Sequence, residues 1–118
     1  MNLTDTVYNR TSELSHSTTD SFSRNFLNKS PSYLRTIKAQ GRELNSKSLA
    51  TLLNNVCETT AYHARSAESI PQLQIYSDSW KQWEDDLAGV VTKTLVERLS
   101  LTEGAKKLVR KHLATHLS

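Results

Sequence analysis

The sequence predicts an all-α fold for this chain of 118 residues. Only three glycines and two prolines interrupt it, apolar residues recur at spacings of three and four, and no stretch alternates long enough to indicate a sheet. The content of 36% apolar and 23% charged residues suits a small domain with one core. We expect helices throughout, in an N-terminal unit over residues 1–68 and a C-terminal helical extension over 69–118.

The first two helices follow from apolar spacing and from the polar residues that separate them. Apolar positions three and four apart predict a first helix over residues 3–14, which the polar run SHSTTD ends. Asp20 can cap a second helix, and a polar turn over residues 28–30 stops it. The side chains expected to point inward from this second helix are Phe22, Phe26 and Leu27.

A third and a fourth helix have clear start and stop signals. Ser30 is a favourable N-cap, Pro31 suits the first helical position, and Gly41 stands where a helix commonly ends in a left-handed conformation. Asn45 or Ser46 can cap the fourth helix. Its apolar stripe is expected to consist of Leu49, Leu52, Leu53 and Val56.

A heptad-like pattern follows Pro71. Six apolar side chains are spaced three, four, three, four and three, namely Leu73, Tyr76, Trp80, Trp83, Leu87 and Val90. Two interpretations stay open: a long helix that packs into the core of its own chain, or a seam that joins two copies in a homodimer. The run Ser100-Leu-Thr-Glu103 resembles a capping box and predicts a last helix after it.

Positive charge gathers around the second and third helices. Between residues 24 and 47 the basic side chains are Arg24, Lys29, Arg35, Lys38, Arg42 and Lys47, opposed there only by Glu43. Residues 57–118 instead balance eight basic side chains with eight acidic ones. A phosphate backbone is the partner that such a local excess fits, although charges of this kind can also merely solvate a helical face.

The order of these elements is that of a helix-turn-helix that binds double-stranded DNA. The third helix, over residues 31–40, is then the recognition helix, and Leu34 and Ile37 are expected to form its buried face. The residues predicted to contact bases are Ser32, Tyr33, Arg35, Thr36, Lys38 and Gln40. The residues predicted to contact phosphates are Arg24, Lys29, Arg42 and Lys47.

One segment, FSRNFLNKSPSYLRTIKAQGRELNSKSLATLL, resembles the lambda-repressor-like, or XRE-type, helix-turn-helix domains. It is also similar to short uncharacterised proteins of alphaproteobacteria and their phages, which carry a phrase like FS-x-x-W/F-L-x-x-S-x-S-Y. Asn28 stands where the XRE-type domains often have a glycine at the end of the second helix. The resemblance implies a lambda-repressor-like bundle that binds DNA sequence-specifically as a dimer and regulates transcription.

Catalytic and metal sites are not expected. His112 and His116 lie four apart and can share a helix face, but no third ligand of suitable type lies nearby. Cys57 lies on the apolar side of the fourth helix and is expected to be a small core residue. The acidic cluster at residues 84–86 spreads around its helix, so the sequence predicts a noncatalytic protein without a cofactor or a metal.

The predicted partners are double-stranded DNA and a second copy of the chain. The alternative is a noncatalytic adaptor that binds another protein through Trp80 and Trp83. The single cysteine suits a reducing compartment, and no apolar window approaches the roughly 18 residues that a membrane span needs. We therefore expect a cytoplasmic protein without a membrane partner.

Overall fold

Helices account for most of residues 2–117, the part of the chain that the computed structural model describes, with side chains described as far as residue 112. They are α1 (Leu3–Ser15), α2 (Thr19–Asn25), α3 (Tyr33–Ala39), α4 (Ser46–Ser69), a 3₁₀ turn η1 (Pro71–Leu73), α5 (Gln74–Arg98) and α6 (Glu103–Leu117). No strand occurs in the described residues. The predicted all-α fold is therefore confirmed.

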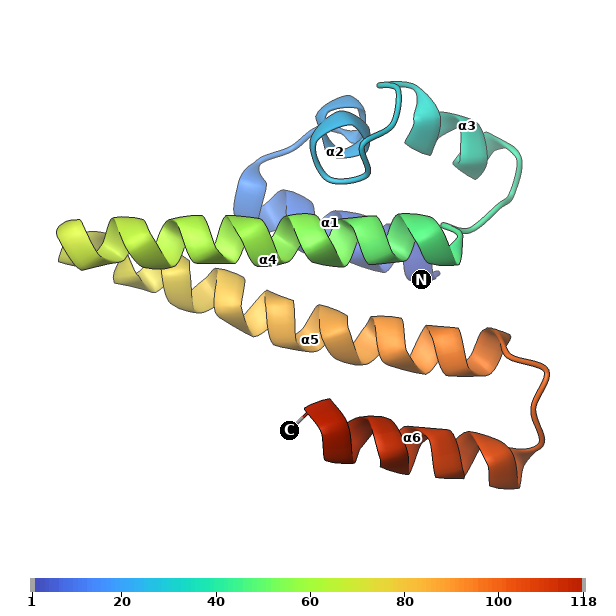
Figure 1. Ribbon diagram of the computed structural model, residues 1–118. Coiled ribbons are helices and arrows are strands. Elements are labelled where there is room, and N and C mark those ends of the chain that lie inside the picture. The colour runs from blue at the N-terminus through green and yellow to red at the C-terminus, as the bar shows by residue number, and fades with distance from the viewer. Residues whose placement is uncertain (1, 118) are drawn as a thin grey trace.

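A long helical hairpin, α4 and α5, forms the base of the molecule. Pro71 ends α4 and starts the η1 turn, which reverses the chain into α5. Helices α2 and α3 lie beyond α4, α1 runs behind α4 in this view and packs on α5, and α6 lies on the opposite side, alongside α5 (Figure 1). None of the helices in the described part of the chain is long and apolar enough to cross a membrane.

One hydrophobic core joins the first five helices. Its buried side chains are Val7, Phe22, Phe26, Leu27, Leu34, Ile37, Leu44, Leu49, Leu52, Val56, Trp80, Trp83, Leu87 and Val91. The Trp83 indole Nε1 donates a hydrogen bond of 3.0 Å to Thr11 Oγ1, which ties α5 to α1. The predicted boundary between residues 68 and 69 therefore runs through a single core rather than between two separate ones.

The six residues of the predicted dimer seam lie in different surroundings. Trp80 and Trp83 are 2% and 1% exposed, and Leu87 is also buried, all of them against the core of their own chain. Leu73 and Val90 are half-buried, and Tyr76 is exposed. Because α1 and α2 cover this face of α5, the structure places the tryptophans where the core-packed interpretation expects them, out of reach of a second copy.

The caps of α2 and α6 differ from the predicted ones. Thr18, not Asp20, caps α2, because Thr18 and Ser21 exchange hydrogen bonds in a reciprocal capping box. Helix α6 begins at Glu103, and the Thr102 hydroxyl accepts the Ala105 N–H at 3.2 Å. Ser100 is therefore not a cap, since it precedes the first helical residue by three positions.

Candidate nucleic-acid interface

The connection from α2 to α3 turns at Asn28. This residue has a φ of 55°, in the left-handed region that asparagine tolerates better than most side chains. Asn55 of α4 supports the turn, because its Nδ2 donates to the Phe26 carbonyl at 2.8 Å and to Asn28 Oδ1 at 3.2 Å. The end of α2 is thus held by its own backbone geometry and by a side chain of α4.

Helices α2 and α3 are joined by a buried hydroxyl. The Ser23 side chain is fully buried and its Oγ accepts the Leu34 N–H at 3.1 Å. The preceding residues form a turn, in which the Tyr33 N–H donates to the Ser30 carbonyl at 3.0 Å. Pro31 lies in this turn, so α3 starts at Tyr33, two residues after the predicted start of the recognition helix.

Gly41 ends α3 as the sequence predicts. Its φ is +65°, a left-handed conformation that a glycine adopts without steric cost. The Arg42 N–H donates to the Ile37 carbonyl at 2.8 Å, and the Gly41 N–H donates to the Lys38 carbonyl at 3.0 Å. These two bonds form a Schellman motif, which satisfies carbonyls that the helix end would otherwise leave unpaired.

Helix α3 buries one face and exposes the other. Leu34 and Ile37 are buried in the core, as predicted. The predicted base-contacting residues that are exposed are Ser32, Arg35, Thr36, Lys38 and Gln40. Tyr33 differs, because it is half-buried and its hydroxyl lies 3.3 Å from Ser48 Oγ of α4. Tyr33 therefore anchors α3 to α4 in this structure.

Two of the exposed cations already have acidic neighbours. Arg35 Nε lies 3.0 Å from Asp20 Oδ1 of α2, and Lys38 Nζ lies 2.8 Å from Asp5 Oδ1 of α1. Both pairs are open to solvent, where an ion pair contributes about 1 kcal/mol or less. A partner with a stronger negative charge can therefore displace these carboxylates at little cost.

The four predicted phosphate-contacting residues, Arg24, Lys29, Arg42 and Lys47, are all exposed. Lys29 Nζ lies 5.4 Å from the centre of the Tyr33 ring, a cation–π distance. Arg42 Nη1 donates to Gln40 Oε1 at 3.1 Å. Lys29 thus lies beside the first residue of α3, and Arg42 follows the end of this helix.

The loop from α3 to α4 is anchored by residues that the sequence did not single out. The Glu43 carboxylate accepts hydrogen bonds from the Thr4 N–H, at 2.9 Å, and from the Thr4 hydroxyl. Arg98 of α5 donates to the Leu44 carbonyl at 2.7 Å and to Ser46 Oγ at 3.2 Å. Thr4 and Arg98 lie 39 and 54 residues away from their partners, so no local pattern indicates these contacts.

Cys57 and the histidines of α6 are the remaining side chains that the sequence analysis singled out. Burial and a hydrogen bond with Glu84 raise the pKa of the Cys57 thiol to about 11, so it stays protonated at neutral pH. No group of three potential metal ligands occurs among the described residues. His112 is exposed on α6, and the side chain of His116 lies outside the described residues.

A family model described as a family of unknown function, DUF6626, matches residues 5–100. The chain belongs to this family. The DUF6626 segment runs from within α1 past the end of α5, crosses residues 68 and 69, and leaves α6 outside. No curated protein and no solved structure matches the chain. DUF6626 thus joins the α2–α3 unit and the α4–α5 hairpin in one sequence unit.

Proposed function

We propose that this protein binds double-stranded DNA in a sequence-specific manner through α3 and regulates transcription, as a lambda-repressor-like helix-turn-helix. The observation that carries the proposal is the division of α3 into a buried face and an exposed polar face. Leu34 and Ile37 fix the helix to the core, while Arg35, Thr36 and Lys38 are left for a partner. A recognition helix in a major groove needs this division.

The turn geometry supports the lambda-repressor-like assignment. Asn28 occupies the place where XRE-type domains often have a glycine, and its backbone is left-handed, as such a glycine position demands. The Schellman motif at Gly41 then leads into α4, whose first residues are capped by Asn45 through a bond of 2.8 Å to the Ser48 N–H. This chain therefore has asparagine instead of glycine at position 28 but adopts the same left-handed backbone conformation.

The surroundings of α3 favour a polyanion over an apolar partner. Lys29 before α3 and Arg42 after it are exposed and can neutralise phosphates, which adds affinity that weakens with salt. The adaptor hypothesis relied instead on Trp80 and Trp83, which are buried in the core. DNA binding is therefore the function that the exposed chemistry supports best.

The test is selection of bound sequences from random DNA, followed by titration of the selected site with the variant Arg35→Ala/Lys38→Ala. A good base contact contributes about 1–3 kcal/mol, so the loss of two such contacts should weaken DNA binding by at least about thirtyfold. The slope of log K against log[salt] should change little, because the cations assigned to phosphates are retained in this variant. Fluorescence anisotropy over a salt series measures both quantities.

The matched control is Lys93→Ala/Lys107→Ala, which removes the same number of charges from exposed sites on α5 and α6. Its affinity should stay within about threefold of the unchanged protein, since only long-range attraction is altered. Equal binding by the Arg35→Ala/Lys38→Ala variant would exclude α3 as the recognition helix. Failure to enrich any sequence would exclude sequence-specific DNA binding.

A further inference from the structure

The α4–α5 hairpin extends beyond the helices that cover it. Helices α1 to α3 lie over one part of α4, and the end of the hairpin that contains η1 continues past them (Figure 1). Along the covered part, Trp80 of α5 packs against Phe26 of the α2 end, with ring centroids 6.1 Å apart. Tyr76 lies one helical turn before Trp80 on the same side of α5. It is exposed, because the N-terminal helices do not cover α5 at this position.

Bulky apolar side chains are exposed at this end and at the edge of the covering helices. Tyr62 of α4, which lines a pocket together with Phe26, is 60% exposed. Ile70 before η1 is 50% exposed, and Ile75 and Tyr76 of α5 are 69% and 58% exposed. We call these four residues the distal patch. At about 200 Å² for each full tyrosine side chain and somewhat less for each isoleucine, their exposed area is roughly 450 Å². That is close to the apolar share of a standard interface, which buries about 800 Å² on each partner and is slightly more than half apolar.

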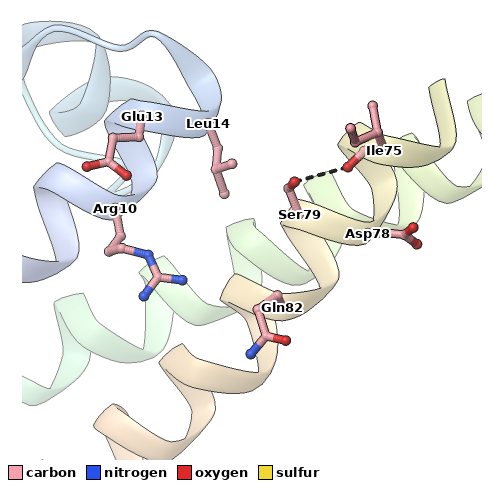
Figure 2. A pocket seen from close by; sticks show the side chains of 7 residues that line it. All are labelled: Arg10, Glu13, Leu14, Ile75, Asp78, Ser79 and Gln82. Carbon is pink, nitrogen blue, oxygen red and sulfur yellow. Dashed lines mark hydrogen bonds between the residues drawn. The ribbon is translucent and has the colours of Figure 1, made fainter. Parts of the chain in front are cut away.

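A groove adjoins the distal patch. It has a volume of about 420 Å³, lies between α1 and α5, and is lined by Arg10, Glu13, Leu14, Ile75, Asp78, Ser79 and Gln82 (Figure 2). Its polar walls bear both signs of charge, and Leu14 and Ile75 add an apolar part. Surfaces of this kind, apolar with a polar rim, are suited to a protein partner.

The charge around the distal patch favours a copy of the same surface. Residues 61–81 carry two cations, Arg65 and Lys81, and two anions, Glu68 and Asp78, so their formal charge is zero with histidine neutral. A nucleic acid gains nothing from such a segment, whereas two copies related by a two-fold axis can set each sign against the other. The apolar centre then supplies the main contact.

We propose that two copies of this chain form a homodimer through the distal patch. The α4 segment from Ser48, beside α3, to the η1 turn spans about 33 Å at 1.5 Å per residue. In an extended dimer the two α3 helices then lie up to about 66 Å apart, near two turns of DNA rather than one. This spacing rests on the proposed DNA binding, but the dimer itself does not.

The test is the mass of the full chain in solution by sedimentation equilibrium, without DNA. We expect twice the chain mass of 13.3 kDa at concentrations up to about 0.1 mM, where an interface of this size should be populated. Ile75→Glu should restore 13.3 kDa, because it places a charge at the centre of the distal patch. Tyr76→Glu should act in the same way, and circular dichroism checks that both variants keep their helices.

The matched control is Leu108→Glu, on the α6 residue that is 70% exposed and lies away from the distal patch. It should leave the dimer intact. A single-chain mass for the unchanged protein at the highest concentration would overturn the proposal, as would an unaltered dimer in both Glu variants of the distal patch. Dissociation by Leu108→Glu alone would assign the interface to α6. Because no DNA is present, each of these outcomes is independent of DNA binding.

Discussion

Polar side chains, more than apolar ones, set the geometry of the α2–α3 turn. Asn28 provides the left-handed residue, and Asn55 holds it from α4 by bonding to the Phe26 carbonyl and to the Asn28 side chain. Ser23 supplies a buried acceptor for the first turn of α3. The apolar residues around them bring the helices together but do not fix the direction of the chain.

Substitutions at Asn28 should separate its backbone role from its side-chain role. We expect Asn28→Ala to lower the free energy of unfolding by about 1–2 kcal/mol, because a Cβ without a polar group disfavours positive φ. Asn28→Gly should change it by less than about 0.5 kcal/mol, since glycine accepts this conformation and loses only the Asn55 contact at 3.2 Å. Urea unfolding followed by circular dichroism measures both, and equal losses in the two variants would contradict a backbone role.

At the scale of elements, α3 forms ion pairs with its neighbours α1 and α2. The carboxylates of Asp20 and Asp5, from α2 and α1, each lie beside a cation that the proposed function assigns to bases. These acids occupy the first turns of their own helices, where a negative charge is favourable. They therefore stabilise α1 and α2 while reducing the positive potential of α3.

Asp5→Asn/Asp20→Asn should bind DNA about two- to tenfold more tightly than the unchanged protein at low salt, because the competing ion pairs and the repulsion of phosphate are both removed. Its free energy of unfolding should fall by about 1 kcal/mol through the loss of the two first-turn charges. Anisotropy titration and thermal unfolding measure these changes. Asp85→Asn/Glu97→Gln, which removes the same number of charges from exposed sites on α5, provides the control for net charge. An equal gain in that variant would show that the ion pairs are irrelevant.

At the scale of the whole molecule, α6 stands apart from the rest. It packs chiefly on α5, lies outside the DUF6626 match, and has no fully buried residue among residues 103–112. Residues 1–102 carry eleven basic and eleven acidic side chains, whereas residues 103–118 carry four basic and one acidic. The whole formal charge of +3 thus belongs to the α6 segment, on the opposite side of the hairpin from α3 (Figure 1).

Removal of residues 103–118 should leave a cooperatively folding protein. We expect the free energy of unfolding to fall by no more than about 2 kcal/mol, because the described α6 side chains are exposed or half-buried and the core cluster contains none of them. Urea unfolding of the shortened chain measures this change. A broad, non-cooperative transition would show that α6 is needed to complete the fold.

Local patterns in the sequence determined most of the helices. The spacing of Leu34 and Ile37, the left-handed position of Gly41, the cap at Asn45 and the break at Pro71 all act within a few residues, and the structure bears them out. The start of α3 and the caps of α2 and α6 were predicted less well. At those points several residues compete for one role, and the geometry of the adjoining turn selects among them.

Only the tertiary structure decided what each face of those helices meets. The spacing of Trp80 and Trp83 fits a dimer seam and a core equally well. Both tryptophans belong to the core because α1 packs against α5 there, with Thr11 bonded to Trp83. Likewise, Arg98 reaches the Leu44 carbonyl across 54 residues, and Asp5 reaches Lys38 from another helix. The reason is physical: periodicity shows that a helix has an apolar face, whereas its partner depends on how distant segments pack.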